Sequence, residues 1–165
     1  MMNKFVSEKI RMRTSARLAA VQATYMIAYG QMPVDEVIQN FVKGEIGRYV
    51  ISEDMFNHEE MVPVEQMDTA YFSNLVKGVH SRKEMLEQSL SGFLNDGWSF
   101  ERMDGTLQAL LLCAVYEISS TLDVDVKVII KEYVDLAYAF FTKYEPKMVN
   151  ALLDTIAKTV RSVEN

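Results

Sequence analysis

The sequence has few of the residues on which many kinds of protein site depend. Its 165 residues include one cysteine, two histidines, three prolines and one tryptophan. The single Cys113 excludes an internal disulfide and indicates a reducing compartment, the cytoplasm. The longest apolar run, residues 109–116, has eight residues, well short of the ~18 that a membrane-spanning helix needs. We therefore expect no membrane segment, and the first residues lack the apolar stretch of a signal peptide.

Motifs for catalysis and for cofactors are also missing. The seven glycines form neither a Walker A loop nor a dinucleotide-binding fingerprint. A helical di-iron site requires a glutamate three residues before the histidine, and neither His58 nor His80 has one there. Cys113 lies in an apolar stripe, where a thiol behaves as a small hydrophobic group, and Asp123 and Asp125 resemble helix caps more than an acid–base pair. We expect a protein that is not an enzyme and binds no metal ion and no cofactor.

Apolar residues recur at helical spacing along most of the chain, and no segment alternates for long enough to suggest a sheet. We expect Thr14 or Ser15 to cap the first helix and Gly30 to end it in the left-handed conformation. The acidic residues 48–62 are expected to form a loop, and residues 95–97 a turn after which Trp98 packs on the core. Together these features predict an all-α fold of about seven helices. The expected ranges are about 14–30, 34–47, 63–80, 82–90, 107–118, 126–140 and 146–163.

Charge is distributed unevenly along the chain. Residues 1–29 carry five basic residues and one acidic residue, a net charge of +4, whereas the rest carries twelve basic and 22 acidic residues, a net charge of −10. A basic end on an acidic body favours a polyanion as ligand and limits unspecific binding elsewhere. The alternative is a solvated helix start with no ligand, and charge alone does not decide between the two.

Two helix starts combine the residue types that RNA binding uses. Arg13 and Arg17 are four residues apart and therefore lie on one helix face, close to Arg11. Arginine offers a planar fork for phosphate and a flat surface for stacking on unpaired bases. Lys143 and Lys147 flank the start of the last helix, whose N-terminal amides attract phosphate. If the two starts lie side by side, they form one RNA-binding patch; otherwise the lysines merely solvate a helix end.

Five segments carry a recognisable pattern in a fixed order. Residues 17–25 (RLAAVQATY) and 71–79 (YFSNLVKGV) resemble the motifs Ala-Arg-x-x-Ala-Val-Gln-Ala-Leu-Tyr and Tyr-Phe-x-x-Leu-x-x-Gly-Val. Residues 110–118 (LLLCAVYEI) resemble Ile-Leu-Arg-x-Ala-x-Tyr-Glu-Leu. Residues 123–132 (DVDVKVIIKE) and 149–154 (VNALLD) are similar to Asp-Val-Pro-x-Lys-Val-x-Ile-Asn-Glu and Val-Asn-Gly/Ala-Val-Leu-Asp. These are motifs of the bacterial transcription factor family NusB, and the likeness spans nearly the whole chain.

The resemblance implies one domain, residues 1–165, with two crossed helical subdomains at about 1–97 and 98–165. It implies a transcription antitermination factor that binds boxA-like single-stranded RNA together with ribosomal protein NusE. Such a factor joins an antitermination complex with RNA polymerase and supports transcription of ribosomal RNA operons. Carried over residue by residue, the resemblance places NusE near Tyr25 and Leu107. The RNA contacts implied by the resemblance, together with the lysine from the charge pattern, are Arg11, Arg13, Arg17, Lys143, Lys147, Met148 and Asn150.

The chain also departs from the family pattern. Thr14 and Ser15 interrupt the arginine run, and Met148 stands where a phenylalanine can stack on a base. Leu107 stands where an acid is common, and Leu112 where arginine is usual. Fewer phosphate contacts weaken RNA affinity and flatten its salt dependence. An alternative is therefore a helical protein-interaction module that has lost RNA binding.

Overall fold

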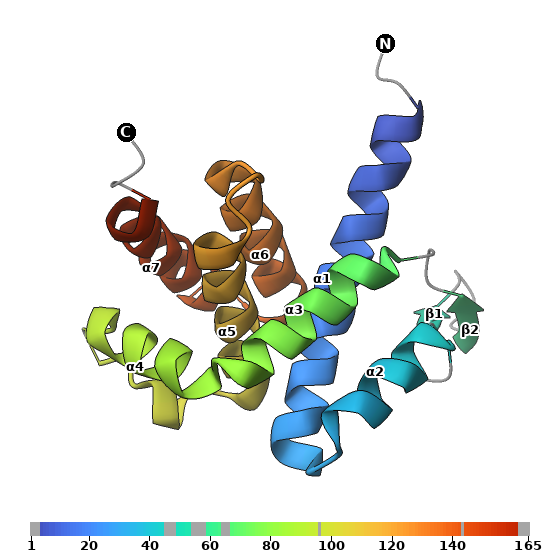
Figure 1. Cartoon of the computed structure of the whole chain (residues 1–165), viewed down its shortest axis with the longest axis horizontal. Helices are drawn as coiled ribbons and strands as arrows, with labels where there is room; N and C mark the ends of the chain where they lie inside the picture. The colour runs from blue at the N-terminus through green and yellow to red at the C-terminus, as the bar shows by residue number, and fades with distance from the viewer. Residues whose placement is uncertain are drawn as a thin grey trace. The chain divides into compact units, whose positions relative to one another are not determined.

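Seven α-helices, a short 3-10 helix and a β-hairpin make up the described part of the chain (Figure 1). The computed structural model describes residues 4–44, 49–53, 59–63, 67–95, 97–142 and 144–161, with side chains except at 4–7, 49–53 and 59–63. The predicted all-α class is confirmed, and the small hairpin is an addition to it. The elements are α1 (Lys4–Gly30), α2 (Val34–Val42), β1 (Tyr49–Glu53), β2 (Glu59–Pro63), α3 (Thr69–Ser81), α4 (Lys83–Phe93), η1 (Phe100–Arg102), α5 (Gly105–Ser120), α6 (Val126–Phe140) and α7 (Tyr144–Arg161).

The chain forms two units, residues 1–76 and 77–165. The boundary lies within α3, earlier than the one expected near residue 97, because α4 packs against α5, α7 and η1 of the second unit. In the first unit α1 packs against α2, and the rings of Phe41 in α2 and Phe72 in α3 lie 5.4 Å apart. In the second unit α5, α6 and α7 pack against one another (Figure 1).

The ends of α1 differ from the sequence expectation. The helix begins at Lys4, so the prediction that Thr14 or Ser15 caps it is wrong. Instead the Thr14 hydroxyl donates to the Ile10 carbonyl oxygen one turn earlier (3.0 Å), a bond that satisfies the side chain inside a helix. Gly30 is the last helical residue, but the left-handed conformation falls on the following residue, Gln31, with φ 53°.

The acidic segment was expected to be a loop, and this prediction is wrong for the residues that the structure describes there. β1 and β2 pair antiparallel, with Tyr49 opposite Pro63 and Glu53 opposite Glu59. Each strand has five residues, and neither YVISE nor EEMVP alternates apolar and polar residues, so period-two spacing does not reveal it. Pro63 therefore ends a strand and does not begin a helix. α3 starts at Thr69, where the Asp68 carboxylate accepts a hydrogen bond from the Tyr71 amide (3.0 Å).

The second unit is built around α5, which is buried on nearly every side. Its buried residues include Cys113, as predicted, and they are Leu107, Ala109–Val115, Glu117 and Ile118. Asp104 caps α5 by accepting from the Thr106 amide (2.8 Å), and Asp125 caps α6 in the same way through the Lys127 amide (2.9 Å). The predicted capping role is thus confirmed for Asp125, whereas Asp123 lies in the preceding turn.

Within this unit the backbone of α3 at Gly78 lies directly against the side chain of Tyr116 in α5, which leaves no room for a Cβ atom. A Cβ atom built on Gly78 would overlap the ring and hydroxyl of Tyr116 in α5. Gly92 in α4, by contrast, has no neighbour within 4 Å of such an atom. The two helical glycines therefore differ in what a methyl group would meet.

Gly78→Ala is expected to lower the free energy of unfolding by about 1–3 kcal/mol, because the close contact with Tyr116 forces a shift in the core. The matched control, Gly92→Ala, is expected to raise it by about 0.5–1 kcal/mol through better helix propensity. Urea unfolding followed by circular dichroism measures both. Equal effects at the two positions would contradict the packing argument.

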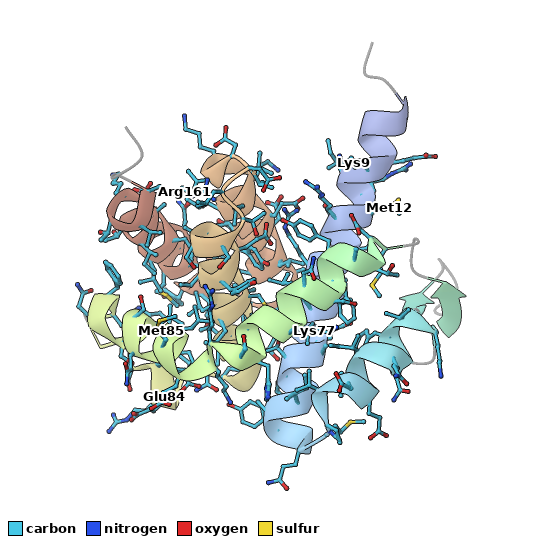
Figure 2. All side chains as sticks on the ribbon, viewed as in Figure 1. Lys9, Met12, Lys77, Glu84, Met85 and Arg161 are labelled. Atoms are coloured by element: carbon cyan, nitrogen blue, oxygen red, sulfur yellow. The ribbon has the colours of Figure 1, made fainter. Side chains whose placement is uncertain are left out.

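One arginine near the end of α7 holds the carboxyl end of α5 (Figure 2). The Arg161 guanidinium donates to three backbone carbonyl oxygens: that of Ile118 (3.0 Å), of Thr121 (3.0 Å) and of Val124 (2.8 Å). The last carbonyls of a helix have no partner within the helix. Arg161 therefore caps α5 and fixes the turn that leads to α6.

Arg161→Lys is expected to destabilise the protein by about 1–3 kcal/mol, because one ammonium group cannot reproduce the three-way fork. Lys158→Ala serves as the control, since it removes an exposed pair with Asp154 (3.1 Å) that is worth at most about 1 kcal/mol. Thermal unfolding of both variants measures the difference. A fully stable Arg161→Lys protein would show that the carbonyl contacts contribute little.

Candidate nucleic-acid interface

The three arginines predicted to bind RNA differ in exposure along α1. Arg11 is exposed and Arg13 is half-buried, whereas Arg17 is only 2% exposed. Almost no surface of Arg17 remains for a ligand. The structure therefore argues against a direct RNA contact by Arg17, although the predicted shared face of Arg13 and Arg17 is present.

Arg13 and Arg17 meet on one aromatic ring, that of Tyr71 in α3. The Arg13 guanidinium carbon lies 4.8 Å from the ring centroid and the Arg17 carbon 5.2 Å from it. The Arg17 Nη2 also donates to the Tyr71 hydroxyl (3.1 Å). These distances are within the range of cation–π interactions. Tyr71 thus orders both arginines, a role that its sequence motif did not reveal because the pairing is tertiary.

One donor of this cluster is unsatisfied. The Nε atom of Arg13 is buried and has no hydrogen-bond partner in the described part of the chain. Buried donors in native proteins are nearly always paired, so each exception calls for an explanation. A ligand with acceptor oxygens is one such explanation, since guanidinium groups bind phosphate through several N–H groups.

The start of α7 offers a second set of contacts in the other unit. Lys147 and Asn150 are exposed and Met148 is half-buried, while Pro146 is buried in the first turn, where proline was expected. Lys143 lies outside the described residues. The Lys147 ammonium lies in the first turn of α7, where the helix N-terminus favours an anion. Because this cluster and the α1 arginines belong to different units, each stands as a site by itself.

The two residues predicted to bind a protein partner have opposite exposures. Tyr25 is 42% exposed and its ring lies 4.9 Å from that of Tyr29, which is 54% exposed. Leu107 is 2% exposed and belongs to the core of α5. The structure therefore argues against Leu107 as a contact residue, because its side chain has almost no surface to offer. Tyr29, which was not among the predicted contact residues, forms an exposed aromatic pair with Tyr25.

Two other kinds of feature, clusters of metal-binding residues and membrane-spanning helices, are absent from the part of the chain that the structure describes. It contains no group of three or more histidine, cysteine, aspartate or glutamate residues close enough to hold a metal ion. His58 lies outside the described residues, and His80 is exposed near the end of α3. Among the described helices, none combines the length and the apolar character needed to cross a membrane.

The contact between the arginines and Tyr71 can be tested by two substitutions of that residue. Tyr71→Phe keeps the ring and removes the hydroxyl that Arg17 donates to, so we expect a loss of about 1 kcal/mol in stability. Tyr71→Leu removes the ring as well, and a further loss of about 1–2 kcal/mol is expected because both cation–π contacts disappear. Urea unfolding of the two variants measures this difference. Equal losses would mean that the ring contributes nothing beyond its hydroxyl.

Comparisons with known proteins agree with the resemblance of the motifs. The model of the NusB family matches residues 14–158. A transcription antitermination protein NusB from Novosphingobium aromaticivorans is 39% identical over 149 residues, 90% of this chain and 95% of that protein. One from Rhizobium johnstonii is also 39% identical, over 90% of this chain and 88% of that protein.

Solved structures show the same fold at lower identity. NusB from T. maritima aligns with a TM-score of 0.69 and 21% identity, covering 88% of this chain and 90% of that one. A structure of the antitermination factors NusB and NusE in complex with double-stranded RNA aligns with a TM-score of 0.68 and 19% identity, covering 90% of this chain and 98% of the matched one. With the family match over residues 14–158, the chain belongs to the NusB family.

Proposed function

We propose that this protein is a transcription antitermination factor that binds boxA-like single-stranded RNA together with ribosomal protein NusE. It acts in the cytoplasm as a non-catalytic part of an antitermination complex with RNA polymerase and supports transcription of ribosomal RNA operons. The observation that carries the proposal is family membership, since relatives 39% identical over 90% of the chain are transcription antitermination proteins. A structural neighbour that contains both NusE and RNA supports the choice of partners.

The start of α1 supplies the arginines for the RNA backbone. Arg11 is exposed, and Arg13 is held over Tyr71 with a buried Nε that lacks a partner. A guanidinium ordered in advance loses less side-chain entropy when it binds phosphate. Arg17 acts as a positioning residue, because it anchors Tyr71 by a hydrogen bond and has almost no exposed surface.

The start of α7 supplies the second set of RNA contacts. Lys147 contributes a cation and Asn150 an amide that can both donate and accept, while Met148 offers an apolar surface to a base. Lys143, which precedes α7 directly in the sequence, adds a further positive charge. These groups suit a single strand, whose bases are unpaired and accessible.

The aromatic pair of α1 is the proposed contact for NusE. Tyr25 and Tyr29 stack on each other and are both exposed. Exposed tyrosines of this kind are enriched in protein interfaces, where the ring is buried and the hydroxyl finds a partner. Leu107 is buried in the core of the second unit and is not part of this proposed contact.

One observation favours the alternative function, a protein-interaction module without RNA binding. Because Arg17 is buried, α1 presents only Arg11 and Arg13 to a polyanion among the three predicted arginines. NusE binding without any preference for RNA sequence would support this alternative over the proposed function.

RNA binding with and without NusE tests the proposal. A boxA-like single strand and a scrambled control are titrated at two salt concentrations and followed by fluorescence anisotropy. We expect binding that prefers the boxA-like strand and strengthens when NusE is present. Replacing Arg11 and Arg13 by alanine together is expected to reduce the slope of log K against log salt by about 1.4, since each phosphate contact with a single strand contributes ~0.7.

Lys131→Ala is the matched control for that double variant. Lys131 is an exposed lysine of α6, paired with Asp135 in its own helix (2.9 Å), and it belongs to neither proposed contact set. Its loss is expected to leave the salt slope unchanged. Equal effects of the control and the arginine variant would contradict a specific role for the start of α1.

A further inference from the structure

The second unit contains a pocket whose lining shares only Met148 with the contacts proposed above. It has a volume of about 260 Å³ and lies between the end of α4, the turn that follows it and one face of α7. The turn closes through a hydrogen bond from the Trp98 amide to the Asn95 carbonyl oxygen (3.1 Å), next to Gly97 with φ 88°. The walls include Phe93, Asn95, Trp98, Met148, Leu152 and Thr155.

The chemistry of these walls matches a flat, uncharged ring. Phe93 and Trp98 contribute aromatic surfaces, and Met148 and Leu152 contribute aliphatic ones. Asn95 adds an amide that can donate and accept hydrogen bonds. Among the described lining residues none carries a charge, so these walls offer a phosphate no counter-ion. The volume is also below the ~300 Å³ at which pockets for larger organic ligands begin.

The pocket continues the proposed RNA contact at the start of α7. Met148 is half-buried and lines the pocket, and the exposed Lys147 precedes it in the same helix turn. A strand whose phosphates lie near Lys147 would therefore bring its bases within reach of Trp98. This continuity favours a nucleotide over a side chain of a protein partner.

We propose that this pocket binds one unpaired base of the RNA, which stacks on Trp98 and meets Asn95 with its polar edge. The inference rests on the proposed RNA-binding function and adds to it a specific base site. In this proposal Trp98 and Asn95 select one nucleotide, and Lys147 binds the adjacent phosphate.

Trp98 is the only tryptophan of the chain, so its intrinsic fluorescence reports on this pocket alone. Titration of the full-length protein with an unlabelled boxA-like single strand is expected to quench that fluorescence, because a stacked base contacts the indole. In parallel, anisotropy with a fluorescein-labelled strand measures affinity independently. Trp98→Ala is expected to weaken binding about tenfold, within the range for the loss of one stacked base, whereas Trp98→Phe retains a ring and loses less.

Two further variants keep the test informative if Trp98→Ala fails to fold. Ala151→Phe places a ring at an exposed helical position of the pocket wall and is expected to lower affinity to a similar degree by filling the space. Gln88→Ala, an exposed position of α4 outside the pocket lining, is the control and is expected to bind as the parent protein does. Circular dichroism melting checks that each variant is folded.

Strands with a single abasic position identify the base that enters the pocket. One abasic position is expected to weaken binding to the parent protein about tenfold and to have little further effect on Trp98→Ala, because both changes remove the same contact. If, at every position of the strand, the loss from the abasic site added to the loss from Trp98→Ala, the base pocket would be overturned.

The remaining outcomes separate this inference from the proposed function. Unchanged fluorescence, together with full affinity of both Trp98→Ala and Ala151→Phe, would overturn the pocket while RNA binding itself stands. Quenching by NusE alone, and not by RNA, would assign the pocket to the protein partner and overturn a base site. Failure of the parent protein to bind the strand, with or without NusE, would overturn the proposed function and the pocket together.

Discussion

The burial of α5 on nearly every side is the constraint on which the second unit depends. A helix without a solvated face leaves its few polar groups without water, so other elements must satisfy them. The Tyr133 hydroxyl donates to the buried Glu117 carboxylate (2.8 Å), and Arg161 binds the carbonyl oxygens at and beyond the end of the helix. Gly78 leaves the space that the Tyr116 side chain of the same helix occupies. The packing of this unit is therefore set by the buried helix α5 and by the side chains that bond to its polar groups.

Arginine has two separate roles in this chain, and its environment decides which one applies. Arg161 and Arg17 are structural: the first caps a helix through three carbonyl oxygens, and the second is buried beside Tyr71. Arg11 and Arg13 keep surface for a ligand. Arginine-rich segments indicate a polyanion site in a sequence, but the guanidinium group is equally suited to bind carbonyl oxygens and aromatic rings. The predicted cluster of three arginines thus divides into two that keep surface for a ligand and one buried anchor.

Much of the helical framework could be predicted from apolar spacing, and the errors have identifiable physical causes. The expected range of α6 was correct, and Asp125 was expected as a cap, because both signals are local. The start of α1 was missed because Thr14 can bond to the preceding turn as well as cap a helix. The hairpin was missed because its strands, acidic at one end, do not alternate apolar and polar residues. The resemblance placed NusE near Leu107, and the burial of that side chain, which depends on tertiary packing, could not be seen in the motif.

The sequence by itself determined the helical class, the NusB family and the residue types at the two helix starts. These properties follow from periodicity, capping chemistry and motif order, all of which act over a few residues. Only the tertiary structure decided that Arg17 is an anchor, that Tyr71 orders two arginines and that Trp98 lines a pocket with Met148. The physical reason is that exposure and ring contacts arise between segments far apart in the chain. Spacing along a single helix shows which face a side chain shares, but not what covers that face.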